Sequence, residues 1–149
     1  KSLRVCPKKI GENFSCSCNE LKTLKGCPEI INGEFSCYKN KLISLEGGPI
    51  EVEDSYYCDH NELISLKGFP KKNKDFDCNS NNLEIENLLE LYYLNNNLKY
   101  INLKNNERLG KLQDIENFTE LNQILKVFNK KKEIKKNINN KKTAKINKI

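Results

Sequence analysis

Residues 35–49, FSCYKNKLISLEGGP, decide the fold, because the same pattern occurs three times at a spacing of 21 residues. Residues 14–28 read FSCSCNELKTLKGCP, and residues 56–70 read YYCDHNELISLKGFP. A fourth, less regular copy begins at Phe76. The shared unit is F-x-C-x-x-N-x-L-x-x-L-x-G-x-P, with Tyr in place of Phe once. Self-similarity at such a period is typical of chains built from stacked structural repeats.

Each unit predicts a short strand, a bend and an extended return. Phe35 and Cys37 alternate with polar neighbours, which indicates a half-buried strand. The Asn at the strand end has an amide that bonds both backbone donors and backbone acceptors, and the two leucines then point inward. The Gly permits an unusual backbone angle, and the Pro holds an extended, polyproline-like return. Because one coil cannot bury its apolar side alone, we expect the coils to stack and their strands to pair in parallel.

The unit resembles the leucine-rich repeat, whose pattern L-x-L-x-x-N-x-L-x-x-L it matches with Phe or Tyr and Cys at the first two apolar positions. The resemblance covers Val5 to about Asn106, and the short Pro-containing unit is similar to bacterial and phage repeats. It implies a repeat solenoid with a parallel β-sheet on the concave side and an extended or 3-10 convex side.

The chain divides into three predicted parts. A leucine-rich-repeat solenoid spans residues 1–106, with units near 6–26, 27–47, 48–68 and 69–88 and an irregular unit over 89–106. A helical C-terminal cap follows over 107–135, and a basic tail rich in Lys and Asn spans 136–149.

The irregular fifth unit has two possible alignments. In the first, Leu91 and Tyr93 form the strand, only 15 residues after Cys78. In the second, the strand contains Leu98 and Ile101, and residues 85–94 form a short helix. We favour the second, because 15 residues hardly close a coil of the same width. A third possibility uses both segments as strands, with one cramped coil between them.

An α-helix over about 118–132 is predicted as the cap of the open solenoid end. Asn117 to Glu120 resemble a capping box. The apolar residues that follow have helical spacing and are Leu121, Ile124, Leu125 and Phe128. After Lys136 the chain is mostly Asn and Lys, and we expect it to be poorly ordered.

The net charge of +6 belongs to the C-terminal part of the chain. Residues 1–104 contain 14 Lys or Arg and 15 Asp or Glu, whereas residues 105–149 contain 12 and 5. A run of like charge is typical of a solvated arm and sometimes contacts nucleic acid or an acidic surface. The lysines of interest for such contact are Lys130, Lys131, Lys132, Lys135, Lys136, Lys141 and Lys142.

The seven cysteines predict packing rather than chemistry. Cys16, Cys37, Cys58 and Cys78 recur in phase as an inward ladder, where a thiol behaves as a small apolar group. Disulfides between equivalent positions of neighbouring strands would need poor geometry, and the spacing lacks zinc knuckles. We therefore expect no metal or other cofactor, and a reducing, cytoplasmic location.

Binding is better supported by the sequence than catalysis. His60, the only histidine, is expected in an exposed turn, and no phosphate loop or nucleophile motif occurs. In leucine-rich repeats the concave face is formed by strand residues that alternate with the buried ones. In the central units these residues are Glu34, Ser36 and Tyr38; Ser55, Tyr57 and Asp59; and Asp75, Asp77 and Asn79.

The sequence thus predicts a non-enzymatic module that binds another protein through this face, with the two tyrosines as anchors. The resemblance suggests a bacterial or phage effector that inhibits a host protein, for example in anti-defence, and a partner that belongs to a nucleic-acid-handling complex. The alternative is a nucleic-acid-binding protein that acts through its lysine tail. We expect no membrane association and a monomer when the protein is free.

Overall fold

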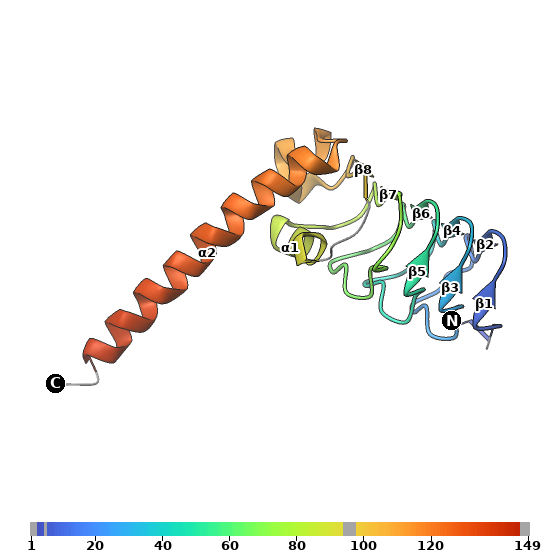
Figure 1. Cartoon of the computed structure of the whole chain (residues 1–149), viewed down its shortest axis with the longest axis horizontal. Helices are drawn as coiled ribbons and strands as arrows, with labels where there is room; N and C mark the ends of the chain where they lie inside the picture. The colour runs from blue at the N-terminus through green and yellow to red at the C-terminus, as the bar shows by residue number, and fades with distance from the viewer. Residues whose placement is uncertain (1–2, 5, 94–97, 147–149) are drawn as a thin grey trace.

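Each repeat unit forms one coil of a β-solenoid in the computed structural model, which describes residues 3–4, 6–93 and 98–146, with side chains up to 140. The strands that carry the F-x-C pattern all run parallel in one five-stranded sheet, in the order β2-β4-β6-β7-β8 (Figure 1). Their bounds are β2 Phe14–Ser15, β4 Phe35–Ser36, β6 Tyr56–Tyr57, β7 Asp75–Asp77 and β8 Tyr100–Asn102. The first aromatic residue of each unit pairs with that of the next, which confirms the repeat solenoid and its parallel sheet.

A second parallel sheet, ordered β1-β3-β5, connects the return segments of the first three coils. Its strands are β1 Lys9–Ile10, β3 Ile30–Ile31 and β5 Glu51–Val52. The extended return is confirmed, but its pairing was not predicted. It arises because stacking brings successive returns within hydrogen-bonding distance, so that Glu53 N donates to Ile31 O at 3.0 Å. Among the described residues, 3-10 structure occurs only after the repeats, in η1 Glu107–Asp114.

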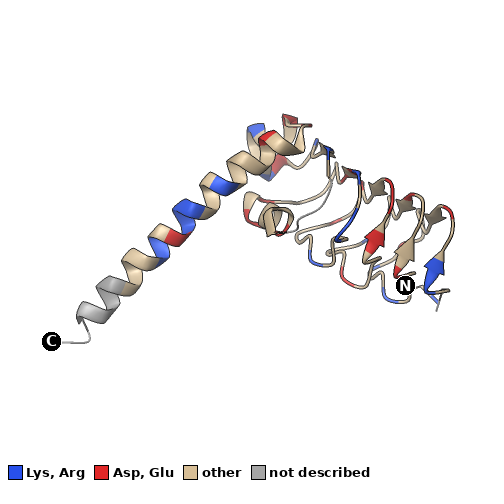
Figure 2. Cartoon of the chain, viewed as in Figure 1, with Lys and Arg blue, Asp and Glu red and all other residues tan. Residues whose placement is uncertain are grey.

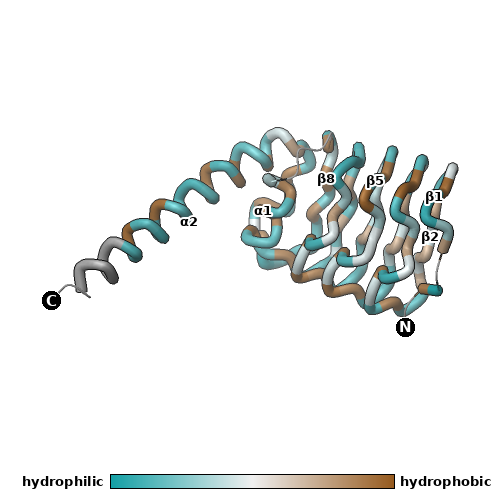
Figure 3. The backbone as a smooth tube through the Cα atoms, turned by 60° about the horizontal axis from the view of Figure 1, so that its bottom comes forward, coloured by the Kyte–Doolittle hydropathy of each residue, from teal (hydrophilic) through white to brown (hydrophobic). Residues whose placement is uncertain are grey.

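Repeated side chains form columns in the interior, and two of these columns lie directly beneath the larger sheet, while the buried leucines fill much of the remaining space. Aromatic rings stack along the solenoid, with centroids 4.7 Å apart between Phe35 and Tyr56 and 5.9 Å apart between Tyr56 and Phe76. The second column is the predicted cysteine ladder, which the structure confirms as buried at Cys16, Cys37, Cys58 and Cys78. Figure 3 shows apolar positions recurring at the same place in successive coils. The core is therefore one continuous stack rather than four separate clusters.

Buried asparagines join each coil to the one before it. Asn61 Nδ2 donates to Cys58 O in its own coil and to Cys37 O in the preceding coil, both at 3.1 Å. Its Oδ1 accepts from Leu42 N at 3.0 Å. The same arrangement occurs at the other members of this asparagine ladder, Asn40, Asn81 and Asn106. The amide thus satisfies backbone groups that the bend would otherwise bury without partners.

The fifth unit follows the favoured alignment. Helix α1, Ile85–Tyr93, leads into β8, in which Ile101 pairs with Phe76. The alternative with a strand through Leu91 and Tyr93 is wrong, and so is the version that uses both segments as strands, because both residues are helical. The segment 94–97 lies outside the described residues.

Helix α2, Phe118–Ile146, covers the end of the solenoid with its first turns and then projects away from it (Figure 1). Asn117 Oδ1 accepts from Glu120 N at 3.2 Å, which confirms the predicted N-terminal cap. Phe118, Leu121 and Leu125 are buried, whereas all residues from 130 to 140 are exposed. The prediction of a helix that ends near 132 and a poorly ordered segment after 136 is wrong for the residues to 146. No Gly or Pro occurs between 118 and 146 to terminate the helix.

No helix in the described part of the chain has an apolar stretch that could cross a membrane.

Candidate functional site

The outward face of the five-stranded sheet carries the predicted binding residues. The aromatic residue of β4, β6 and β7 and the cysteine that directly follows each strand are buried, so the side chains between them point outward. The strand register places Ser36, Tyr57 and Asp77 in one row, which continues to Asn102 of β8. A second row lies two residues further along each coil and contains Tyr38, Asp59 and Asn79. The periodicity of the sheet therefore converts separated sequence positions into one continuous surface.

Five of the nine predicted residues line one shallow hollow of about 510 Å³ in this face. They are Glu34, Ser36, Tyr38, Tyr57 and Asp59. The two tyrosines come from adjacent coils, and each is partly exposed. The hollow thus presents two phenol rings framed by carboxylates and a hydroxyl group.

Ser55 is the exception among the predicted residues. Register places it beside Glu34 and Asp75 on the same row, but it is only 6% exposed. Its side chain is shorter than those of Glu34 and Asp75, between which the strand register places it. The prediction that Ser55 contributes to the binding surface is therefore wrong.

Two residues of the hollow, Lys39 and His60, were not predicted to belong to it. Both precede a ladder asparagine and have positive φ, 51° and 52°. The same conformation occurs at the equivalent Cys18, Ser80 and Asn105. This left-handed turn directs a row of side chains along the edge of the sheet. The sequence could have indicated this row, since each of these residues stands directly before the repeated Asn. His60 Nδ1 lies 2.8 Å from Asp59 Oδ2.

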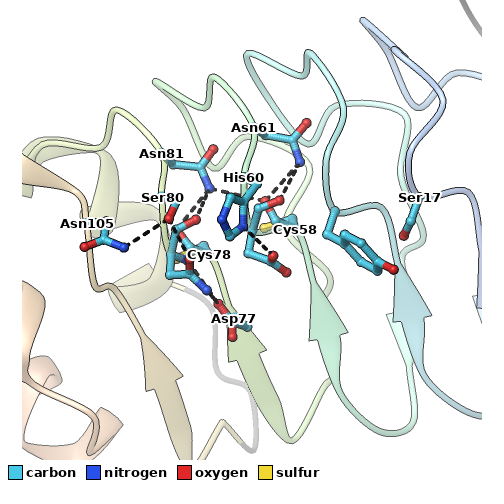
Figure 4. Close-up of polar contacts among 12 residues, drawn as sticks. Ser17, Cys58, His60, Asn61, Asp77, Cys78, Ser80, Asn81 and Asn105 are labelled. Atoms are coloured by element: carbon cyan, nitrogen blue, oxygen red, sulfur yellow. Dashed lines mark hydrogen bonds and ion pairs between the residues drawn. The ribbon is translucent and has the colours of Figure 1, made fainter.

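Hydrogen bonds between side chains fix the C-terminal part of this face. Asp77 Oδ1 accepts from Asn79 Nδ2 at 2.7 Å, and Asp77 Oδ2 accepts from Asn102 Nδ2 at 3.0 Å. Ser80 Oγ donates to Asn79 Oδ1 at 2.8 Å and accepts from Asn105 Nδ2 at 3.2 Å (Figure 4). A partner would meet a preorganised polar platform here.

Tyr100 adds a third tyrosine that the sequence did not place on the face. It is 40% exposed and pairs with Asp75 at the start of β8. Partial burial, followed by the negative charges of Glu116 and Asp77, raises the pKa of the Tyr100 phenol. We call the full set the sheet surface; it consists of Glu34, Ser36, Tyr38, Lys39, Tyr57, Asp59, His60, Asp75, Asp77, Asn79 and Tyr100.

The predicted lysines lie on the projecting part of α2, far along the chain from the sheet surface (Figure 2). Lys130, Lys131, Lys132, Lys135 and Lys136 are all exposed. At 100° per residue they point to several sides of the helix rather than to one. Lys141 and Lys142 lie within the helical backbone, but their side chains are outside the described ones. The two candidate surfaces are therefore separate.

The buried thiols are poor nucleophiles. Burial raises the pKa of Cys16 to about 12 and that of Cys37 well above its ordinary value. All seven cysteines are free. Among the described residues, no three His, Cys, Asp or Glu side chains are grouped so as to hold a metal ion.

Comparison of the chain with protein-family models, with curated proteins and with solved structures finds no match.

Proposed function

We propose that the protein is a non-enzymatic binding module whose protein partner docks on the sheet surface. The observation that carries this proposal is the pair Tyr38 and Tyr57, which line one hollow on coils joined by hydrogen bonds. Tyrosine provides a large contact area at a low cost in side-chain entropy, and it is enriched at interface hot spots. Because the strands beneath are fixed by the core, little further order is lost on binding.

The charges of the sheet surface indicate the kind of patch the partner presents. Glu34, Asp59, Asp75 and Asp77 provide four carboxylates, and Lys39 provides the one permanent positive charge of the set. A basic or amide-rich patch complements this arrangement, and complementarity of charge increases association rates and specificity.

Three further parts of the proposal concern identity and setting. The repeat pattern supports assigning the solenoid to the leucine-rich-repeat type. The similarity of its short unit to bacterial and phage repeats supports an effector or inhibitor of a host protein, such as an anti-defence factor. Free thiols throughout the core support a reducing, cytosolic compartment.

The test is capture of partners from the native host by the full-length protein, quantified by mass spectrometry and followed by affinity measurement with the captured protein. The variant is Tyr38→Ala with Tyr57→Ala. The matched control is Ile43→Ala with Ile64→Ala, which removes exposed apolar side chains outside the sheet surface. We expect the tyrosine variant to weaken binding at least about a hundredfold, since hot-spot residues contribute about 2 kcal/mol each.

Equal affinity of the tyrosine variant and the wild type would refute the role of the sheet surface. The alternative function, nucleic-acid binding through the lysines, predicts a steep salt dependence that disappears when residues 126–149 are removed. If the protein binds nucleic acid in this way and no protein partner binds the sheet surface, the alternative function is the correct one.

A further inference from the structure

The projecting part of α2 carries an apolar stripe that the solenoid does not cover. Ile124, Val127, Ile134 and Ile138 are separated by three, seven and four residues, which places them on one side of the helix. Val127, Ile134 and Ile138 are 55%, 49% and 49% exposed. In Figure 3 short apolar stretches interrupt the otherwise hydrophilic helix. This spacing is that of a coiled-coil seam, with Lys131 at the position between Val127 and Ile134.

The stripe begins at an apolar groove between α1 and α2. The groove has a volume of about 390 Å³ and is mostly apolar. Its lining comes from the start of α1 and the first half of α2 and consists of Ile85, Gln123, Ile124, Val127, Phe128 and Lys131. Groove and stripe together extend over residues 124–138, which corresponds to about 21 Å of helix.

Lysines surround the stripe and determine the charge of what can cover it. Residues 126–140 contain six lysines and one glutamate, Glu133. A second copy of α2 would bring the same positive charges together along the seam, and like charges disfavour such pairing. A lipid surface suits a broad apolar face, whereas this stripe is one residue wide and is interrupted by Lys131. An acidic helix complements both the narrow seam and the positive charges beside it.

We propose that this groove and stripe, the α2 seam, form a docking site for an acidic amphipathic helix of a partner protein. The partner helix would place apolar side chains at i, i+3 or i+4, and i+7 against Val127, Ile134 and Ile138. Its Asp and Glu residues would flank that row and face Lys130 and Lys135. The site lies apart from the sheet surface and does not depend on its function.

The experiment measures binding of a labelled synthetic 21-residue helix to the full-length protein by fluorescence anisotropy. The peptide has Leu at heptad positions a and d and Glu at the flanking positions e and g. The comparison peptides are a scrambled version of the same composition and a version with Lys in place of Glu. The variant is Val127→Ser with Ile134→Ser and Ile138→Ser, and the control is Ile43→Ser with Ile64→Ser. All five replaced side chains are about half exposed, so circular dichroism should show unchanged folding.

We expect saturable binding of the acidic peptide, at least about tenfold weaker binding of the seam variant, and no change in the control variant. The scrambled and Lys-containing peptides should bind at least about tenfold more weakly than the acidic one. Equal binding of the acidic and scrambled peptides would overturn the proposal, because charge alone would then explain it. A dimer in analytical ultracentrifugation that the seam variant abolishes would also overturn the proposal. The same holds if the acidic peptide fails to bind while binding to vesicles or to nucleic acid depends on the three apolar residues.

Discussion

Replacement of Asn61 by Ala is expected to lower the free energy of unfolding by about 3 kcal/mol. The change removes four hydrogen bonds. The three shortest join the Asn61 side chain to the carbonyls of Cys37 and Cys58 and to the amide of Leu42, and the fourth ends on Asp59 O at 3.3 Å. Each carbonyl keeps a partner, because Asn40 also donates to Cys37 O and Asn81 also donates to Cys58 O. The Asp59 carbonyl keeps the amide of Lys39.

The Leu42 amide, in contrast, accounts for the largest part of the cost. It is buried in the joint between two coils and loses its acceptor. An unsatisfied buried donor costs about 1–3 kcal/mol, and each of the lost bonds to the Cys37 and Cys58 carbonyls contributes about 0.5–1.5 kcal/mol. Asn61→Asp should be at least as destabilising at neutral pH, because the carboxylate faces three carbonyl oxygens without a proton to donate.

Urea unfolding followed by circular dichroism and by tyrosine fluorescence measures the effect. With a slope of about 2 kcal/mol per molar urea, the midpoint should fall by about 1.5 M. Asn19→Ala is the matched control, because Asn19 is exposed and its side chain donates to the carbonyls of Cys16 and Ser17 in its own coil. Equal shifts for Asn61→Ala and Asn19→Ala would refute the idea that the ladder joins the coils.

Two further predictions concern the core and the turns. The pKa of the Cys58 thiol is raised well above the ordinary 9.0 by burial, so the folded protein keeps a proton that the unfolded chain loses above about pH 9. The stability that this thiol contributes is complete below that pH and falls by about 1.4 kcal/mol per pH unit above it. The free energy of unfolding of Cys58→Ala, measured in urea at alkaline pH, should therefore fall less steeply with pH than that of the wild type. An equally steep fall in both proteins would contradict a raised pKa for Cys58. Gly68→Ala should lower the free energy of unfolding by about 2 kcal/mol in the same assay, because Gly68 has φ of +92° and a Cβ there would overlap the Leu45 carbonyl. Gly11→Ala is the control and should be nearly neutral, since a Cβ at Gly11 has no atom within 4 Å.

The repeat period predicted the features of the fold that depend only on side-chain chemistry within one unit. Alternation of apolar and polar residues identified the buried Phe35 and Cys37 and the outward Ser36 and Tyr38. The length needed to close a coil identified α1 and β8. These features follow from local pattern and chain geometry, which a sequence contains directly.

Other features depend on contacts between coils that no single unit reveals. The second sheet forms only when the returns are stacked, so Ile30 and Ile31 gave no period-two signal for it. Lys39 and His60 reach the sheet surface through a left-handed turn directly before the ladder asparagine. The length of α2 was underestimated because low apolar content was interpreted as disorder, although nothing in the segment terminates a helix.

The asparagine joint also has an evolutionary consequence. Each coil after the first is attached to its predecessor by the same amide with equivalent backbone partners, so a segment of 21 residues is an interchangeable module. In-frame duplication of one module would lengthen the binding face by about 4.8 Å and require no new kind of contact. Selection can therefore adjust the reach of this surface by copying genetic units, and length differences among descendants of such a gene should occur in whole coils.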